Sequence, residues 1–348
     1  MANDLMQAFS YQHKCLLLYN SAADLIKLSQ RRGAALQRLL TGTGIFPGDF
    51  HQPGHRISPK EWLTLAENCQ QLVGRDELPM LAADAILYNN KIALSRLLQC
   101  CPSLLQALTL LYYFRHQSLP LLSISLYRQQ HYLNICLLPA IGLGKQQDFV
   151  IALAVSFLLT LIRQYAPEAE LQVELSQSPP ARPQYYQQHW QQHWQCETRF
   201  NCLQNSIMLP LQLLQQPARV QLSADFIQAR FICRQQRRLQ QRSDGLLAVI
   251  RKKQQQLLPE NSSAEHIAAM LNISSSTLKR QLHQHNYSFS QLLDEVKNHK
   301  AIKLLRQYKL TNAQLAQRLG YSDEHNFRRA FKRWTGLLPS ACKKLLKT

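Results

Sequence analysis

Two segments in the last quarter of the chain carry basic and hydrogen-bonding side chains at the spacing of one helix face. The residues are Ser276, Thr277, Lys279, Arg280 and His283 in the first segment, and His325, Asn326, Arg328, Arg329 and Lys332 in the second. Guanidinium and ammonium groups neutralise phosphates, and a guanidinium can also donate two hydrogen bonds to a guanine. The chemistry that these residues indicate is recognition of nucleic acid, not the making or breaking of bonds.

The main alternative chemistry is a metal site. Its candidate ligands are His189, His193, Cys196 and Cys202. The two histidines would share one face of a helix, but Trp190 and Trp194 have the same spacing, which favours an amphipathic packing helix. The chain has no phosphate-binding glycine loop and no nucleophile elbow. We therefore predict no catalytic residue, no cofactor and no metal.

A pair of helices must position the first basic face. The pattern at 262–265 is that of a capping box, and the chain turns at 272–274. The helix that follows has Leu278 and Leu282 facing inward, so the basic residues between them face outward.

A second pair of helices repeats this pattern. Thr311 and Gln314 form its capping box, the turn lies at 320–322, and Phe327 and Phe331 face inward. Two copies of a capped helix pair with a basic second helix predict two helix-turn-helix units.

The two units repeat at nearly constant spacing. Ala268 and Ala316 are 48 positions apart, whereas Leu278 and Phe327 are 49 apart, so the second turn is one residue longer. A helix over 290–306 separates the units and spans about 25 Å at ~1.5 Å per residue. A rigid spacer of this length can place two recognition helices about one DNA turn, ~34 Å, apart. One chain would then contact two successive major grooves.

Length and charge agree with this division of the chain. The 348 residues are enough for two domains, and the formal net charge is +19. Residues 245–348 hold 18 Lys and Arg against 6 Asp and Glu, so the excess lies with the helix pairs. Such an excess indicates a polyanionic partner.

The chain carries no sign of export or of a membrane anchor. Its most apolar stretch, 149–162, is shorter than the ~18–20 residues that span a bilayer and is expected to be a buried core helix. The first residues lack the pattern of a signal peptide, and nine cysteines without paired spacing indicate reduced thiols. We expect a cytoplasmic protein with no membrane partner.

The first part of the chain predicts an α+β domain that encloses a pocket. We expect this domain at 1–222, a linker helix at 223–244, and an all-α domain with the two helix-turn-helix units at 245–348. The predicted elements are a helix from Ser21 to about Leu40, a helix over 58–73, helical segments at 80–99 and 103–115, a hairpin over 122–137 with one buried face, a helix over 146–165, and strands at 170–176, 196–202 and 206–209.

Residues 246–344 resemble the DNA-binding domain of the AraC/XylS transcription regulators. The similarity is densest at Leu315-Ala316, 319–322, Asn326-Phe327, 330–336 and Pro339. The chain departs from the family pattern where Cys342 and Lys343 replace an aromatic residue and an arginine.

The resemblance implies roles for the outward residues of each recognition helix. It implies base contacts by Ser276, Lys279, Arg280, His325 and Arg329. Thr277, Asn326, Arg328 and Lys332 would hold phosphates, which position the protein without specifying a sequence.

The first domain resembles, more loosely, the ligand-sensing domain of the ornithine- and arginine-responsive branch of this family. The similar segments are 40–45, 56–57, 104–108 and 183–185. The resemblance implies a small-molecule effector and self-association.

The sequence therefore favours a sequence-specific transcription regulator that responds to a small molecule. Its expected partners are double-stranded promoter DNA, the effector, RNA polymerase and a second copy of the chain. Two alternatives stay open at this point: a DNA-repair alkyltransferase with a cysteine nucleophile, and a non-specific nucleoid-binding protein.

Overall fold

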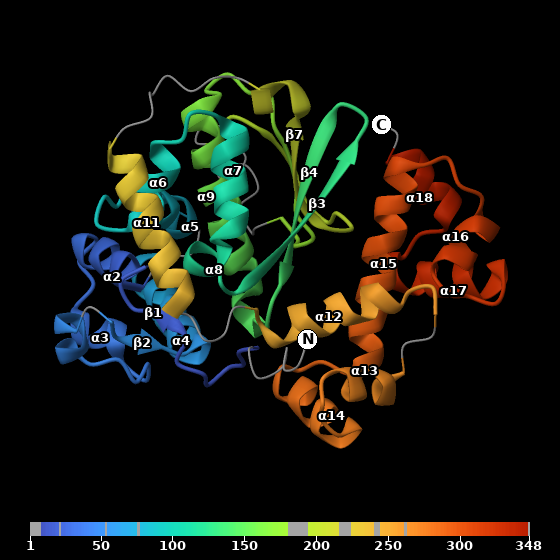
Figure 1. The fold of residues 1–348 in the computed structure, drawn as a ribbon, viewed down its shortest axis with the longest axis horizontal. Coiled ribbons are helices and arrows are strands. Elements are labelled where there is room, and N and C mark those ends of the chain that lie inside the picture. The colour runs from blue at the N-terminus through green and yellow to red at the C-terminus, as the bar shows by residue number, and fades with distance from the viewer. Residues whose placement is uncertain are drawn as a thin grey trace.

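The computed structural model describes residues 8–20, 22–52, 54–74, 77–179, 194–215, 224–239, 244–260 and 263–346. Over these residues the chain forms an N-terminal unit of helices and a sheet, followed by a C-terminal unit that is all helical (Figure 1). The predicted fold class, α+β followed by all-α, is confirmed.

A mixed sheet forms the side of the N-terminal unit that faces the C-terminal unit (Figure 1). In order across the sheet, its strands are β3 (Leu122–Gln129), β4 (Tyr132–Pro139), β7 (Asn205–Pro210), β5 (Gln172–Glu174) and β6 (Glu197–Arg199). Strands β3 and β4 are the predicted hairpin, and only β5 and β6 are parallel. A separate antiparallel pair joins β1 (Leu16–Leu17) to β2 (Arg56–Ile57).

The helices of the N-terminal unit lie on the side of this sheet that is turned away from the C-terminal unit (Figure 1). They are α2 (Ala22–Arg31), α3 (Leu36–Leu40), α4 (Pro59–Val73), α5 (Leu78–Leu87), α6 (Ala93–Gln99), α7 (Leu104–Tyr113), α8 (Arg115–Ser118), α9 (Gln147–Tyr165) and α11 (Ala224–Leu239), with short 3-10 turns η1 (Pro47–His51), η2 (Gly144–Gln146) and η3 (Leu211–Gln215). The segment 144–165 has the length and composition to cross a membrane, but 72% of its most apolar window is buried inside the protein. The expected core helix is confirmed.

The single helix predicted from Ser21 to Leu40 is wrong. Ser21 itself lies outside the described residues, and the chain beyond it forms two helices, α2 and α3. Gly33 separates them with a φ of +89°, and the Ala34 N–H donates to the Ser29 carbonyl at 3.0 Å. This bond closes a Schellman motif, which ends a helix because a left-handed residue cannot continue it.

The C-terminal unit contains two small cores at the two ends of one long helix. Its helices are α12 (Leu246–Leu257), α13 (Ala264–Met270), α14 (Ser275–Gln284), α15 (Phe289–Gln307), α16 (Asn312–Arg318), α17 (Glu324–Thr335) and α18 (Pro339–Leu345). One core joins α12, α13 and α14 to the start of α15, and the other joins α16, α17 and α18 to its end. Each helix-turn-helix unit therefore has its own core, and α15 is the predicted spacer.

The helix caps bear out one of the two predicted capping boxes. Thr311 and Gln314 form the box reciprocally at the start of α16. At α13 the N-cap is Ser263, whose hydroxyl accepts from the His266 N–H, so Glu265 lies one position too early to close a box. The box predicted at 262–265 is therefore wrong, because Ser263 caps the helix one residue later than the pattern suggested; Ser262 itself lies outside the described residues.

Cys342 and Lys343, the two residues that depart from the family pattern, both have contacts that hold α18 in place. Cys342, where the family has an aromatic residue, is 0% exposed and packs with Phe327 and Phe331 in the second core. Lys343 donates from its Nζ to the Leu310 carbonyl at 2.5 Å, so α18 is held against the loop before α16.

The predicted hairpin has both faces covered, not one. Its apolar face packs inside the N-terminal unit, as expected. Its other face meets α15 of the C-terminal unit, and Tyr127, Asn134 and Cys136 are all buried there. The alternating pattern correctly identified which face is apolar, but a polar face can also be buried when a second unit supplies hydrogen-bond partners.

Candidate DNA interface

Helix α14 presents the first predicted set of residues to solvent. Its N-cap is Ser274, whose hydroxyl accepts from the Thr277 N–H at 3.1 Å. Leu278 and Leu282 are fully buried and fix the helix on its core. Because they lie four apart, the opposite face points outward. On that face Ser276, Lys279, Arg280 and His283 are exposed, and Thr277 is half-buried.

Helix α17 presents the second set in the same way. Phe327 and Phe331 are fully buried, and their tilted rings pack with centroids 5.7 Å apart. Asp323 is the N-cap and accepts from the Asn326 N–H at 2.7 Å; such bonds hold the pKa of its carboxyl below the usual value. All five predicted residues on this helix are exposed, namely His325, Asn326, Arg328, Arg329 and Lys332.

The side chain of Asn326 already has partners within the protein. Its Nδ2 donates to Asp323 Oδ2 at 2.7 Å, and Ser322 Oγ lies 3.5 Å from the same nitrogen. A phosphate contact by Asn326 would compete with this local network.

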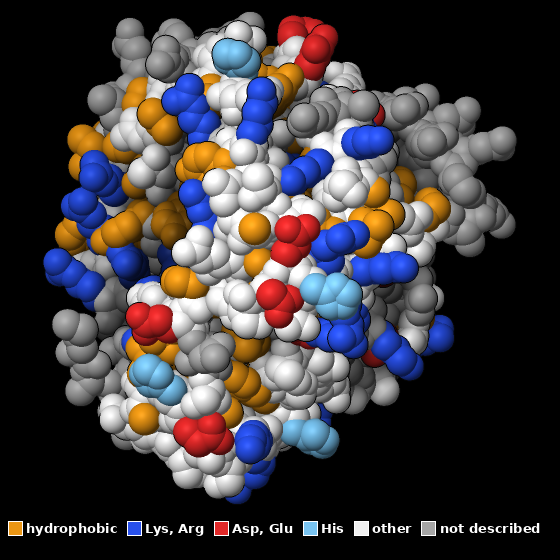
Figure 2. Space-filling model, turned by 90° about the vertical axis from the view of Figure 1, so that its right-hand side faces the viewer, with side chains coloured by type: hydrophobic (Ala, Val, Ile, Leu, Met, Phe, Trp, Pro, Cys, Tyr) orange, Lys and Arg blue, Asp and Glu red, His pale blue; other side chains and the backbone are white. Residues whose placement is uncertain are grey.

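The cations of the two recognition faces have no acidic neighbour within ion-pair distance, among the residues that the structure describes. This holds for Lys279, Arg280, Arg328, Arg329 and Lys332. Arg333, one position further, differs because its Nη2 lies 2.8 Å from Asp294 Oδ2 on α15. That pair braces α17 against the spacer helix. Figure 2 shows the side of the molecule where the C-terminal unit lies, and Lys and Arg outnumber Asp and Glu there.

The turns of the two units each contain one residue with a left-handed backbone, at equivalent positions. Asn272 has a φ of +54° and Gly320 a φ of +73°, and they are 48 positions apart, like the two alanines. The N-caps Ser274 and Asp323 are 49 apart, which confirms that the second turn is one residue longer.

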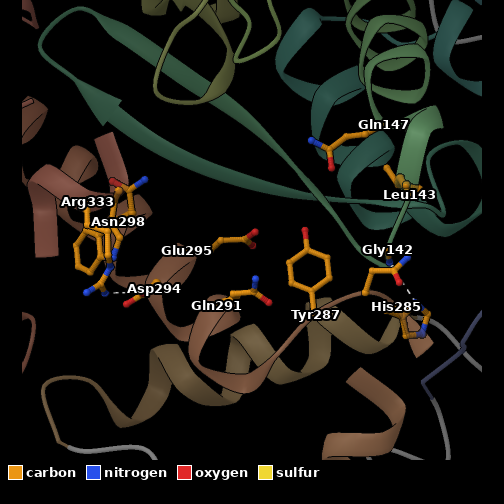
Figure 3. Close-up of a pocket in the computed structure, with 13 residues that line it drawn as sticks. Gly142, Leu143, Gln147, His285, Tyr287, Gln291, Asp294, Glu295, Asn298 and Arg333 are labelled. Atoms are coloured by element: carbon orange, nitrogen blue, oxygen red, sulfur yellow. Dashed lines mark hydrogen bonds and ion pairs between the residues drawn. The ribbon is translucent and has the colours of Figure 1, made fainter. Parts of the chain in front are cut away.

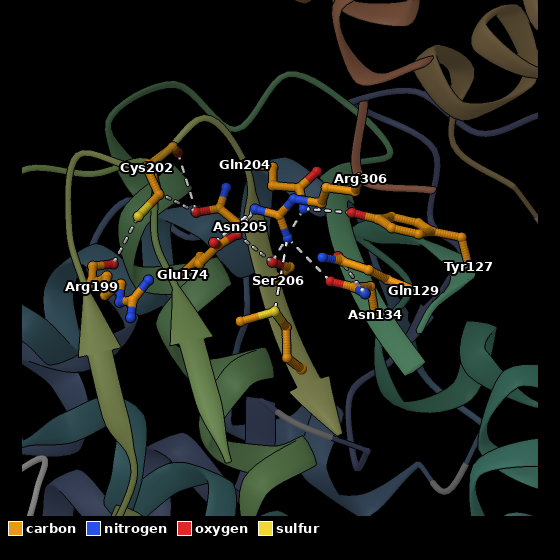
Figure 4. A network of polar contacts seen from close by, with 12 residues as sticks. Tyr127, Gln129, Asn134, Glu174, Arg199, Cys202, Gln204, Asn205, Ser206 and Arg306 are labelled. Carbon is orange, nitrogen blue, oxygen red and sulfur yellow. Dashed lines mark hydrogen bonds and ion pairs between the residues drawn. The ribbon is translucent and has the colours of Figure 1, made fainter. Parts of the chain in front are cut away.

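A buried ion pair connects the spacer helix to the sheet, and sequence analysis missed it (Figure 4). Arg306 near the end of α15 donates from Nη2 to both carboxylate oxygens of Glu174 on β5, at 2.7 and 2.6 Å. Its Nη1 donates to Asn134 Oδ1 at 3.2 Å. The side chains of Arg306 and Glu174 are only 4% and 10% exposed. No local pattern could have revealed a pair separated by 132 positions.

Further contacts of the same interface lie along α15 and α12. His299 Nε2 lies 3.3 Å from Ser125 Oγ on β3, and burial lowers the pKa of this imidazole to about 4. Arg251 donates to the Pro139 carbonyl and lies 2.8 Å from Glu295. These contacts hold the spacer helix against the hairpin at several points.

The two units also approach at backbone distance. The Gly142 N–H donates to Nδ1 of His285 at 3.2 Å, and a Cβ at Gly142 would lie 2.2 Å from the His285 carbonyl oxygen. Only glycine fits at this position. Burial lowers the pKa of His285 to about 4, so the ring is neutral at pH 7 and can accept this bond.

A cleft of about 550 Å³ lies beside this contact (Figure 3). Gly142, Leu143, Gly144 and Gln147 of the N-terminal unit line one end, and α15 with the end of α17 lines the other. Its two carboxylates, Asp294 and Glu295, are paired with Arg333 and Arg251.

Five of the buried thiols do not have the environment of a nucleophile. Burial raises the pKa of Cys69 and Cys342 to about 11 and that of Cys101, Cys136 and Cys233 to about 12. A reactive cysteine needs the opposite shift, because the thiolate is the attacking form.

Of the four candidate metal ligands, only Cys196 and Cys202 lie within the described residues. Cys196 lies 3.8 Å from the Thr198 hydroxyl, and its pKa is raised to about 11 by burial. His189 and His193 lie outside the described residues. Within the described part of the chain, no group of three His, Cys, Asp or Glu side chains is placed to hold a metal.

Comparisons with known proteins cover both units. Residues 33–218 match the family model of the N-terminal arabinose-binding domain of the AraC transcription regulator. Residues 267–344 match the family model of a helix-turn-helix domain. An uncharacterized HTH-type transcriptional regulator of Mycobacterium tuberculosis is 27% identical over 335 residues, which are 91% of this chain and 93% of the relative. The ornithine utilization regulator of Pseudomonas aeruginosa is 35% identical over 97 residues, 28% of this chain and 29% of its own.

Solved structures also align with the chain. The transcriptional regulator CdpR of Pseudomonas aeruginosa aligns over 94% of this chain and 98% of its own, with 20% identity and a TM-score of 0.43. The C-terminal domain of AraT, a response regulator of Geobacillus stearothermophilus, aligns over 28% of this chain and 84% of its own, with 30% identity and a TM-score of 0.27.

Proposed function

Because this chain belongs to the AraC family of transcription regulators, we propose that it binds specific promoter sequences by placing α14 and α17 in two successive major grooves. The observation that carries the proposal is the pair of exposed basic faces, one at each end of α15, whose cations have no acidic group within ion-pair distance among the described residues. A guanidinium without a protein partner is available to bases and phosphates.

The chain is a regulator and not an enzyme. The protonated state of the buried thiols argues in addition against a cysteine nucleophile of the alkyltransferase type. A non-specific nucleoid-binding role stays open as the second candidate, since phosphate contacts alone would produce it.

We assign the finer roles by position. Arg280 and Arg329 are the proposed guanine contacts, with Ser276, Lys279 and His325 as further base contacts. The proposed phosphate contacts are Thr277, Asn326, Arg328 and Lys332, and His283 lies at the end of the same face.

The N-terminal domain, proposed at 1–222, would bind a small-molecule effector. The linker helix is proposed at 223–244 and the DNA-binding domain at 245–348. We further propose RNA polymerase as a partner and the cytoplasm as the location. Self-association is supported by α11, where Ile227 and Phe231 lie four apart and are 70% and 59% exposed.

Binding assays on sites recovered by chromatin pull-down test this proposal. We expect Arg280→Ala and Arg329→Ala each to lower the preference for the site over random DNA by about five- to 150-fold, which corresponds to ~1–3 kcal/mol per bidentate contact. Lys332→Ala should weaken binding to both DNAs equally and reduce the salt slope by about 0.9.

Arg38→Ala serves as the control, because Arg38 is an exposed arginine of α3 in the N-terminal unit. It should leave affinity and preference unchanged. Equal affinity of the wild type for site and random DNA would favour the nucleoid-binding role and contradict the proposal.

A further inference from the structure

Three cavities of the described residues differ in what they could hold. One of about 40 Å³ near Trp62 and Leu119 is too small for more than water. The cleft between the units is large, but its carboxylates are already neutralised by arginines. The third, of about 160 Å³, lies in the N-terminal unit between α7 and the β3–β4 hairpin, with α9 and η3 closing it.

This third cavity is lined almost wholly by leucine and isoleucine side chains. Leu111 and Ile135 form its buried end, while Leu105 and Leu126 are 50% and 43% exposed at its mouth. The hydroxyl of Thr109, which also lines it, donates to the Leu105 carbonyl at 2.7 Å and is satisfied. Apart from the Tyr112 side chain, the described lining therefore offers a ligand no uncommitted polar group.

We propose that this cavity binds a small apolar molecule, a single aromatic ring or an aliphatic chain of about six carbons. A cavity of ~150 Å³ lined by aliphatic side chains holds one benzene ring, which sets the size. A sugar or a free amino acid would lose its hydrogen bonds to water here without replacement, so the lining selects against both. The proposal rests on the effector role proposed above and specifies the chemical class of that effector.

The cavity and the interface with α15 lie on opposite faces of the same two strands. Ile124 and Leu126 of β3 point into the cavity, and Ser125 and Tyr127 between them point toward α15. Successive side chains of a strand alternate between faces, so this arrangement follows from the register of the hairpin.

Strand β4 alternates in the same way. Leu133 and Ile135 line the cavity, whereas Asn134 between them accepts the hydrogen bond from Arg306. In Figure 1 the two strands run between α7 on one side and α15 on the other. A molecule that shifts the hairpin on entering the cavity changes the contacts of α15, and thereby the placement of both recognition helices. The effect requires only that the molecule binds the two arrangements with different affinity.

Fluorine NMR of fluorobenzene with the full-length protein tests the binding. We expect the fluorine chemical shift to change in a saturable way as protein is added, and we expect arabinose and ornithine not to displace the bound fluorobenzene. Leu105→Trp fills the mouth of the cavity and should weaken binding at least tenfold, and Leu126→Trp should do the same. Leu338→Trp is the matched control, because Leu338 is 40% exposed but lies in the C-terminal unit. It should change the affinity less than twofold.

DNA affinity measured with and without fluorobenzene tests the coupling. We expect a change of at least threefold in the wild type, none in Leu105→Trp, and a clearly smaller change in Arg306→Met and in His299→Gln. Absence of saturable binding, or binding that both tryptophan variants leave intact, overturns the cavity assignment. Binding without any change in DNA affinity overturns the coupling. The NMR samples contain no DNA, so they test binding to the cavity even if the protein does not recognise specific DNA. Failure of the proposed DNA recognition can therefore be told apart from failure of the cavity assignment.

Discussion

Arg306 is the residue that ties the spacer helix to the sheet, and its energetics follow from burial. A buried ion pair gains Coulomb energy but loses the hydration of both charges. Here the guanidinium also donates to Asn134, and Ser206 Oγ donates to Glu174 Oε2 at 3.0 Å, so the carboxylate is well satisfied. Removing one partner would leave the other charged and buried.

We therefore predict that Arg306→Met destabilises the protein by about 3 kcal/mol, the usual cost of an uncompensated buried charge. Chemical denaturation of the wild type and the variant measures this. Adding Glu174→Leu to Arg306→Met should recover most of the loss, because the stranded charge is then gone.

Arg199 and Glu197 supply the matched control for this prediction. They form an ion pair at 2.7 Å, but their side chains are 43% and 52% exposed. Arg199→Met should change the stability by less than about 1 kcal/mol. A loss at Arg306 no larger than at Arg199 would contradict the account.

The helix-turn-helix units depend on the turns between their helices. Gly320 has a left-handed backbone, and a Cβ there would lie 2.1 Å from the Pro259 carbonyl oxygen. Gly336, at the end of α17, has nearly the same φ of +72°, but no atom lies within 4 Å of its Cβ position. The two glycines thus separate the cost of the backbone conformation from the cost of a clash.

We predict that Gly336→Ala costs ~1–2 kcal/mol, the price of a left-handed alanine. Gly320→Ala should cost clearly more, since the backbone of residue 259 must also move. Thermal unfolding gives the comparison, and footprinting of Gly320→Ala should lose protection over the half-site of α17 while keeping that of α14. Equal losses for the two variants would show that the clash relaxes without cost.

The interface between the two units makes the stability of the whole protein depend on pH. His285 and His299 are both buried in it, and burial lowers the pKa of each from 6.5 to about 4. The positive charges of Lys303, Arg251 and Arg306 lower the pKa of His299 further. In the unfolded chain the same imidazoles have their ordinary pKa.

The unfolded chain consequently binds more protons than the folded one between pH 4 and 6.5. The stability that these neutral imidazoles contribute is present above pH 6.5 and is lost as the pH falls toward 4, by up to about 3 kcal/mol for each. Urea denaturation at several pH values between 7.5 and 4.5 should show this loss, and His299→Gln should make it shallower. His131→Gln, at an exposed position, is the control and should reproduce the wild-type slope.

Much of the fold and of the candidate DNA interface could be predicted from the sequence, because the features involved are local. The period of Leu278 and Leu282, and of Phe327 and Phe331, selects the buried face of each recognition helix within a few turns of chain. The box of Thr311 and Gln314 acts over three residues. The break at Gly33 was missed even though it is local, since a glycine in a helical pattern can be tolerated or can end the helix.

The amino-acid sequence by itself determined the two helix pairs, the spacer, the hairpin and the residues that face outward on α14 and α17. Only the tertiary structure decided which polar side chains become buried, and with what partner. Ser125, Asn134 and Glu174 look like solvent-facing residues of strands until α15 covers them, and Arg306 looks like one more surface cation. The reason is physical: side-chain alternation and helix capping depend on neighbours in sequence, whereas the burial of a charge depends on a surface that arrives from more than a hundred residues away.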